Sequence, residues 1–296
     1  MQSPIYKPQD VDQVRRIEIE LTSVCNLKCP LCVREVVGIG NENPLWRSLE
    51  EIKEQLDKFT NLEFVTIAGA IAEPTSYPDL FGLLIYLRKR DIEISLYING
   101  DTRNDAYYTK LGVVFRECKG YVYFTICGST QELHGHYRVG SKLNRVLRRL
   151  DIVKRYSGDR TILTWIVFNY NEEDFHQNYQ EYKDKYKTEF FYTLPMDEHF
   201  ELGGNIRLPD AQHEIYMKGV DRSNFPTECV ANKNDFLQIT NDGKEVPCSL
   251  YRLYGESRCF ECSAKNTNLL RRNKIFPVAE SETETSEKDL RLYEDT

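Results

Sequence analysis

The sequence of 296 residues contains no apolar run close to the roughly 20 residues that a membrane-spanning helix needs. Its first residues, MQSPIYKPQDVDQVRR, lack the apolar segment of a secretory signal peptide. The sequence also lacks the motifs of dinucleotide-binding loops, P-loops, Gly-x-Ser-x-Gly hydrolases and His-Glu-x-x-His metalloproteases. We therefore expect a cytoplasmic protein without membrane association, whose chemistry depends on none of these motifs.

A strong charge of one sign is also missing from most of the chain. The net charge is −7, but residues 280–296 hold seven acidic and two basic residues and so contribute −5 of it. The rest of the chain is close to neutral, which argues against general coating of nucleic acid. The acidic, polar end is expected to be disordered, because it has too few apolar residues to form a core.

Short β-rich runs alternate with helical patterns in the first two thirds of the chain. The expected strands lie at 17–21, 64–68, 92–98, 121–126, 161–168 and 189–193, and the expected helices at 49–59, 78–90, 104–118, 141–156 and 172–186. Ser48 and Glu51 form a capping-box pattern, and Ser141 is expected to cap the fourth helix. Six β units with five helices predict an α/β fold with a mostly parallel sheet, either a partial (β/α)6 TIM barrel or an open doubly wound sheet.

Nine cysteines are the most informative feature, because a reducing compartment disfavours structural disulfides. Cys25, Cys29 and Cys32 form Cys-x3-Cys-x2-Cys directly after the first expected strand, in a position where α/β folds place functional loops. Thiolates suit iron–sulfur clusters, and three of them leave one iron of a [4Fe-4S] cube open to another molecule. The alternative is three buried or zinc-binding cysteines.

The segment SVCNLKCPLC resembles the signature of the radical S-adenosylmethionine (SAM) superfamily, and the resemblance extends over residues 14–195. After the second strand, the segment GAIAEP (residues 69–74) resembles the family's Gly-Gly-Glu-Pro motif, with Ala72 where Gly is usual. Leu31 stands where an aromatic residue often packs on adenine. The resemblance implies that SAM is bound by Gly69, Ala70, Ala72 and Glu73. An ordinary loop is the alternative.

Later strand ends resemble further motifs of the family. Asn99-Gly100 resembles Thr-Asn-Gly, and Thr125-Ile126-Cys127-Gly128 resembles Ser-x-Asp-Gly with Cys127 in place of Asp. The stretch His134-Gly135-His136-Tyr137-Arg138 resembles His-x-x-Tyr-Arg. Arg138 would then pair with the SAM carboxylate, and a surface salt bridge is the alternative.

The resemblance thus adds Asn99, Thr125, Arg138 and Ile166 to the SAM site. A simple turn at Asn99 and core packing of Trp165-Ile166-Val167 are the alternatives. Cys127 is a candidate radical or substrate contact, and Cys118 is expected to fill the core. The histidines are expected to face solvent or to support other residues.

The remaining four cysteines form a second group. Cys229, Cys248, Cys259 and Cys262 are spaced Cys-x18-Cys-x10-Cys-x2-Cys, around a β-hairpin expected at 235–240 and 244–246. The group resembles a twitch or shortened SPASM-type extension, which implies an auxiliary [4Fe-4S] cluster with a closed coordination shell. Structural zinc is the alternative. The expected domains are a core at 14–195, a connector at 196–228, an auxiliary-cluster module at 229–276 and an acidic tail at 277–296.

The resemblance implies an enzyme that cleaves SAM reductively to a 5′-deoxyadenosyl radical, which abstracts hydrogen from a substrate. A flavodoxin- or ferredoxin-like protein would donate the electron. A peptide or protein side chain is the expected substrate, and a small molecule would also be compatible. A nucleoside or nucleic acid is the alternative, because the helix at 141–156 contains Lys142, Arg145, Arg148, Arg149, Lys154 and Arg155. The non-enzymatic alternative is a zinc or iron–sulfur scaffold.

Metal analysis separates these interpretations. The protein, reconstituted anaerobically, should contain about eight iron and about eight sulfide per chain, because two cubes require this content. About four iron with one zinc would replace the auxiliary cluster by zinc and keep the enzyme. Zinc without iron would contradict the radical SAM interpretation. Elemental analysis by plasma mass spectrometry and a colorimetric sulfide assay give these numbers.

Overall fold

A β-sheet forms the centre of the computed structural model, which describes residues 11–32, 34, 41, 44–68, 72–192 and 236–246. Its strands are β1 (Arg16–Ile19), β2 (Phe64–Ile67), β3 (Glu93–Ile98), β4 (Gly120–Ile126), β5 (Thr161–Val167), β6 (Lys187–Tyr192), β7 (Phe236–Ile239) and β8 (Glu245–Val246). They lie in the order β6-β5-β4-β3-β2-β1-β7-β8, and only β7 with β8 is antiparallel. The predicted α/β fold with a mostly parallel sheet is confirmed.

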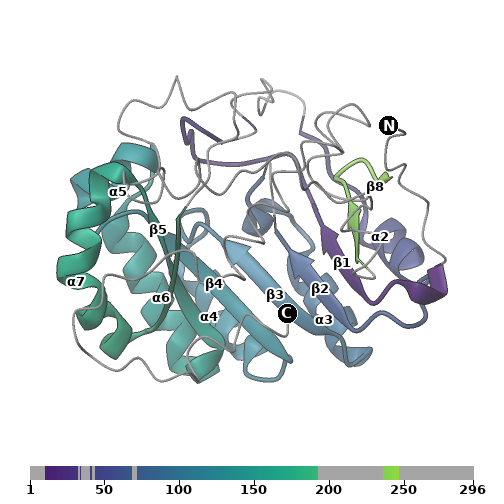
Figure 1. Cartoon of the computed structure of the whole chain (residues 1–296). Coiled ribbons are helices and arrows are strands. Elements are labelled where there is room, and N and C mark those ends of the chain that lie inside the picture. Colours follow the sequence, from purple (N-terminus) through teal and green to yellow (C-terminus); the bar gives the residue numbers. More distant parts are fainter. Residues whose placement is uncertain are drawn as a thin grey trace, which may run out of the picture.

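Helices cover one face of the curved sheet (Figure 1). They are α2 (Leu49–Leu56), α3 (Leu80–Lys89), α4 (Asp105–Phe115), α5 (Gln131–Tyr137), α6 (Leu143–Ser157) and α7 (Glu172–Lys185). The capping box at Ser48 and Glu51 is present at the start of α2. No helix in the described part of the chain has the length and apolar character that a membrane crossing needs.

The alternation of side chains along each strand separates the two faces of the sheet. Ile17 and Ile19 of β1 are fully buried in the core that the helices cover. Glu18, between them, is paired in register with Thr66 on β2 and Gln238 on β7. The face away from the helices is therefore polar where these three strands meet, and we call it the inner face.

Two local predictions differ from the structure around α5. This helix was not expected, and it begins after Thr130, whose side chain accepts a hydrogen bond from the Leu133 amide. Ser141 does not cap α6, because Lys142 occupies the N-cap position and makes no side-chain capping bond. The Ser141 hydroxyl instead lies 2.9 Å from Nε2 of His134, so a long-range contact replaces the expected local one.

The expected hairpin is formed by β7 and β8. The sequence did not predict that β7 pairs in parallel with β1, with Ile17 opposite Leu237 and Ile19 opposite Ile239. This pairing attaches the hairpin to the edge of the main sheet. The connector at 196–228, the tail at 277–296 and most of the module at 229–276 lie outside the described residues, so these domain boundaries stay predictions.

The polar inner face has a measurable consequence at Glu18. Gln238 donates a hydrogen bond from Nε2 to Oε1 of Glu18 at 3.2 Å. Burial raises the pKa of Glu18 from its ordinary value of 4.5 to about 7, because the surroundings disfavour the carboxylate. As the pH rises through this range, the unfolded chain releases the proton first, so ionisation of Glu18 progressively destabilises the fold.

We predict that Glu18→Gln stabilises the protein only at neutral and higher pH. The amide keeps the shape of the side chain and removes the charge, so the gain in unfolding free energy should be about 1–3 kcal/mol at pH 8 and close to zero at pH 4. Urea unfolding between pH 4 and pH 8 measures this gain in unfolding free energy, and Glu54→Gln at an exposed position of α2 is the control. A difference that does not change with pH would contradict the prediction.

Candidate functional site

The three cysteines lie in the loop after β1, which is bonded to the segments that follow β2, β3 and β4. The carbonyl of Val24 accepts from the Glu73 amide at 2.9 Å, and the Lys28 amide donates to the Val139 carbonyl at 3.1 Å. Asn26 donates from Nδ2 to the carbonyl of Asp101 at 3.2 Å. This cysteine loop (residues 22–32) therefore meets the carboxyl ends of three neighbouring strands.

Cys25, Cys29 and Cys32 form no disulfide among the described residues and are partly exposed. Burial raises the pKa of Cys25 to about 11, and Glu73 and Cys32 raise it further, against the effect of Arg138. Burial likewise raises the pKa of Cys29 to about 12; Arg138 opposes this shift, and Cys32, Cys127 and Cys25 add to it. The thiolates therefore need an added positive charge, which the irons of a cluster supply.

The chemistry of the three thiols limits which metal groups they can hold. Within the described residues, no three His, Cys, Asp or Glu side chains converge closely enough to hold one metal ion. The ligands of an iron–sulfur cube bind different irons and need not converge on one point. Three thiolates suit a [4Fe-4S] cluster, and zinc on Cys25, Cys29 and Cys32 stays the alternative.

Glu73 connects the ends of β2 and β3 beneath the cysteine loop. Its Oε1 accepts from the amide of Thr75 at 3.2 Å and from the Thr75 hydroxyl at 2.5 Å. Its Oε2 accepts from the Asn99 amide at 2.8 Å. Burial raises the pKa of this carboxyl, whereas these hydrogen bonds and Arg138 lower it. A carboxylate has further acceptor positions, so Glu73 can still bind a cationic group.

Asn99 lies between Glu73 and Cys25. Its Nδ2 donates to Oδ1 of Asn26 at 2.8 Å and is 4.0 Å from Sγ of Cys25. The predicted site residues Glu73, Asn99 and Cys25 are thus brought together at the end of the sheet. Whether Asn99 binds SAM or only forms a turn after β3 stays a prediction.

Arg138, directly after α5, points its charge toward the cysteines. Its Nε is buried and has no hydrogen-bond partner among the described residues. Burial alone lowers the pKa of Arg138, but the neighbouring Cys127 and Cys29 raise it above its ordinary value. Binding of the SAM carboxylate and a surface salt bridge both stay predictions for Arg138. An unsatisfied buried donor beside the cysteine loop is suited to an anionic group.

Cys127 is fully buried, with 0% of its surface exposed. It packs with Ile166 and Phe168, against which Leu31, Tyr137 and Tyr170 also lie. A direct contact of this thiol with a substrate would require these side chains to separate. Cys118 is likewise buried in the main core, as expected for a core residue.

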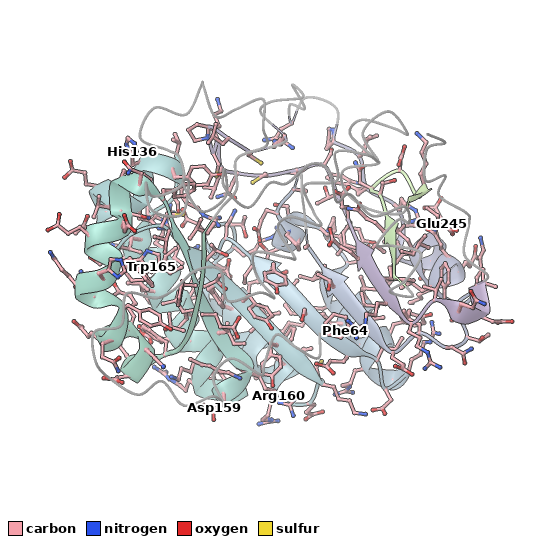
Figure 2. All side chains as sticks on the ribbon, viewed as in Figure 1. Phe64, His136, Asp159, Arg160, Trp165 and Glu245 are labelled. Atoms are coloured by element: carbon pink, nitrogen blue, oxygen red, sulfur yellow. The ribbon has the colours of Figure 1, made fainter. Side chains whose placement is uncertain are left out.

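His134 supports this region as a neutral side chain. Burial and then Arg138 lower the pKa of His134 to about 3. Nδ1 accepts a hydrogen bond from the Cys127 amide at 3.3 Å, so Nε2 carries the hydrogen and donates to Ser141. His134 is therefore a buried supporting residue, whereas His136 is at the outer end of α5 (Figure 2).

The remaining residues predicted for the SAM site and the second cysteine group differ in where they lie. Trp165 packs against Phe175 and Tyr182 in the core that α7 covers (Figure 2), so core packing is the correct interpretation of this residue. Thr125 and Ile166 are nearly buried at the ends of β4 and β5. Ala72 directly precedes Glu73 and is partly exposed. Six predicted site residues lie outside the described residues: Gly69, Ala70, Cys229, Cys248, Cys259 and Cys262.

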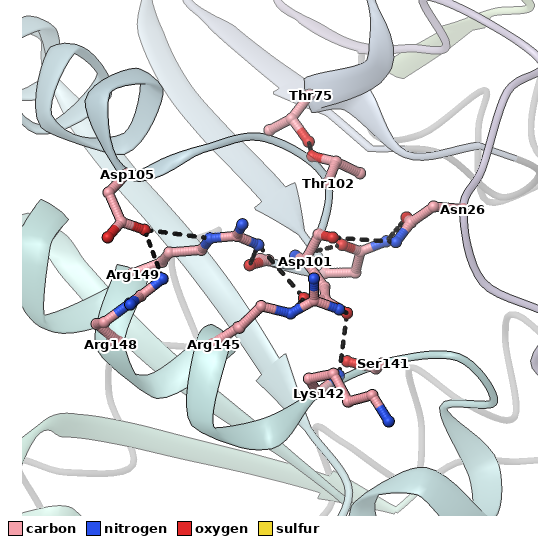
Figure 3. A network of polar contacts seen from close by, with 12 residues as sticks. Asn26, Thr75, Asp101, Thr102, Asp105, Ser141, Lys142, Arg145, Arg148 and Arg149 are labelled. Atoms are coloured by element: carbon pink, nitrogen blue, oxygen red, sulfur yellow. Dashed lines mark hydrogen bonds and ion pairs between the residues drawn. The ribbon is translucent and has the colours of Figure 1, made fainter.

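Three arginines of the basic helix α6 form ion pairs within the protein. Arg145 and Arg149 form ion pairs with Asp101 at 2.9 and 3.3 Å, and Arg148 pairs with Asp105 at 3.0 Å (Figure 3). Sequence reasoning missed Asp101 as part of the site. The four-residue spacing of Arg145 and Arg149, which places both on one face of a helix, was the available signal.

Comparisons with known proteins agree with this geometry. The family model described as "Radical SAM superfamily" matches residues 19–181, more than half of the chain. The tungsten-containing aldehyde ferredoxin oxidoreductase cofactor-modifying protein of Pyrococcus furiosus is 24% identical over 98 residues, which are 33% of this chain and 27% of that protein.

Solved structures share the fold. Streptococcus suis SuiB bound to precursor peptide SuiA has a TM-score of 0.57 and 16% identity, over 81% of this chain and 61% of that chain. Native anSMEcpe with bound AdoMet has a TM-score of 0.55 and 17% identity, over 80% of this chain and 74% of that chain. The present chain thus matches less than two thirds of the Pyrococcus protein and of SuiB. At these identities, the likeness establishes the fold.

Proposed function

The chain belongs to the radical SAM superfamily, and from this premise we propose that it is an enzyme that holds a [4Fe-4S] cluster on Cys25, Cys29 and Cys32. With SAM bound, this cofactor supplies reductive cleavage of SAM to a 5′-deoxyadenosyl radical, which abstracts hydrogen from a substrate. The observation that carries the proposal is the cysteine loop beside two unlike groups, the Glu73 carboxylate and the Arg138 guanidinium, whose Nε has no hydrogen-bond partner among the described residues.

These two groups match the two charges at the amino-acid end of SAM. Arg138 would bind the SAM carboxylate, because a guanidinium donates two parallel hydrogen bonds to a carboxylate. Glu73 would accept from the ammonium, and Asn99 would support both Glu73 and Cys25. Thr125 and Ile166 would line the ribose and adenine. The backbone at Gly69, Ala70 and Ala72 completes the proposed SAM site.

An auxiliary cluster is proposed on Cys229, Cys248, Cys259 and Cys262. Four thiolates close the coordination shell, so this cluster would transfer electrons or stabilise the fold rather than bind substrate. A flavodoxin- or ferredoxin-like donor would supply the electron for SAM cleavage.

Side chains on the inner face favour a peptide as the substrate. Tyr97 is 37% exposed, and its ring stacks on Tyr123 with centroids 4.3 Å apart and an interplanar angle of 6°. The two residues lie opposite each other in register, two positions before Asn99 and Thr125, so the pair sits about 7 Å further down the strands. Stacked tyrosines are suited to an amino-acid side chain that reaches below the bound SAM.

The charges near this pair favour peptide over nucleic acid. Glu189 is close enough to Tyr123 to raise the pKa of Tyr123, after the larger effects of burial and of Tyr97. A carboxylate in this position repels phosphate. Of the six basic residues that motivated the nucleic-acid alternative, Arg145, Arg148 and Arg149 are paired with Asp101 and Asp105. SuiB, whose structure contains its precursor peptide, shares the fold.

We predict that the reconstituted protein forms 5′-deoxyadenosine during anaerobic incubation with SAM and dithionite. Cys25→Ala removes a cluster ligand and should reduce this product at least about 100-fold. Cys118→Ala, a thiol deletion in the core away from the site, should retain most of the activity. Chromatography with mass spectrometry measures the product. Its absence from iron-loaded wild-type protein would overturn the proposed function.

The same assay distinguishes the substrate classes. With co-expressed peptide fractions, we expect mass changes that depend on SAM and that are absent from RNA fractions. Tyr97→Leu should lower the rate of peptide modification about fivefold, because the loss of the exposed ring weakens substrate binding by roughly 1 kcal/mol. SAM cleavage without substrate should stay within about twofold of wild type. Modified nucleosides without modified peptides would favour the alternative.

A further inference from the structure

The segment Asn99–Asp101 at the end of β3 is held by ion pairs and hydrogen bonds between Asp101 and α6. The Asp101 side chain has 0% exposure, and its Oδ1 lies 2.9 Å from Nε of Arg145 and 3.3 Å from Nη1 of Arg149 (Figure 3). Its Oδ2 accepts from the Lys142 amide at 3.0 Å and from Nη2 of Arg145 at 3.1 Å. Because buried charges are stable only when they are paired, this carboxylate and the two arginines hold one another in place.

The same segment also forms hydrogen bonds with the cysteine loop. The Asp101 amide donates to Oδ1 of Asn99 at 2.8 Å, which orients the Asn99 side chain. The Asp101 carbonyl accepts from Nδ2 of Asn26 at 3.2 Å, and Asn99 donates back to Oδ1 of Asn26 at 2.8 Å. Asn26 directly follows Cys25, and Nδ2 of Asn99 is 4.0 Å from the Cys25 sulfur.

We propose that Asp101 is a positioning residue, which fixes Cys25 for its role in the cofactor site. The inference rests on the proposed function, in which Cys25 is a cluster ligand. Asp101 acts through Asn99 and Asn26, because its carboxylate faces α6 while its backbone holds both amides. Arg145 and Arg149 of α6 therefore stabilise the cysteine loop indirectly, through Asp101, rather than binding an external phosphate.

The neighbouring Asp105 offers a matched control. It also pairs with arginines of α6, with Arg148 at 3.0 Å and more distantly with Arg149 at 3.7 Å. The shorter pair is exposed, with 42% of the Asp105 and 60% of the Arg148 side-chain surface accessible. Asp105 is at the start of α4, outside the segment that touches the cysteine loop. Asp101→Asn and Asp105→Asn thus remove the same charge from two ends of one network.

The test measures how well Cys25 is held in anaerobic, iron-free protein. Asp101→Asn should increase the rate of Cys25 alkylation by iodoacetamide about tenfold, because the loop opens more often. Peptide mass spectrometry follows the reaction, with the buried Cys118 as an internal reference for global unfolding. Asp105→Asn should leave the rate within about twofold of wild type. An unchanged rate for Cys25 in Asp101→Asn would overturn the proposal.

A second variant keeps the test decisive if Asp101→Asn unfolds. Asn26→Ala leaves the ion pairs of Asp101 intact and removes the two bonds that reach the cysteine loop. It should reproduce the faster alkylation of Cys25 while Cys118 stays protected. If Cys25 reacts at the wild-type rate in Asn26→Ala, the proposed connection is wrong.

Loading with iron then separates this inference from the proposed function. Wild-type protein should bind SAM with a change in the electron paramagnetic resonance signal of the reduced cluster. In Asp101→Asn, the apparent Kd for this change should rise about tenfold at normal iron content. If wild-type protein takes up no iron, the proposed function fails, whereas the alkylation rates still decide whether Asp101 holds Cys25.

Discussion

Parallel hydrogen bonding between successive strands is the constraint on which this molecule depends. Each strand from β1 to β6 pairs in parallel with the next, so all of their carboxyl ends meet at one edge of the sheet. Loops that are distant in the sequence are therefore brought together there. The cysteine loop, Glu73, Asn99 and Arg138 come from four such loops, and no single segment contains the site.

Buried charges make this edge specific, because each must find a partner. Glu73 accepts hydrogen bonds from two segments and so fixes the end of β2 against the end of β3. Asp101 is saturated by α6 in the same way. Arg138 has a buried Nε without a hydrogen-bond partner in the described part of the chain, as have Arg145 and Arg149 on α6. The two carboxylates fix the ends of the strands, and in the proposed function the Arg138 guanidinium binds the anionic end of SAM.

The distribution of charge on α6 also changes how the helix is understood. A basic helix on an otherwise near-neutral body suggests a phosphate-binding surface. In the structure, Arg145, Arg148 and Arg149 pair with Asp101 and Asp105, while the inner face contains Tyr97 and Glu189. The polarity of the candidate substrate region is thus set by the strands, and the helix stabilises the edge on which the cysteines lie.

The sequence alone determined the features that local chemistry encodes. Such features include the spacing of Cys25, Cys29 and Cys32, the capping box at Ser48 and the pattern of each strand and helix. Each of them depends on residues that are close together in the sequence. These patterns were enough for the fold class and for the position of the cysteines at a strand end. Resemblance to the family then identified Glu73, Asn99 and Arg138, which the structure brings together around the cysteine loop.

Only the tertiary structure decided which of these side chains touch. Asp101 meets Arg149 across 48 positions of the chain, and β7 joins the sheet beside β1 although more than 200 residues separate them. His134 bonds to Ser141 because α5 folds back onto the start of α6, so the serine is not available as a cap. Contacts of this kind depend on packing and on the pairing of buried charges. Local sequence patterns do not encode them, since the partner of each group is chosen by the fold as a whole.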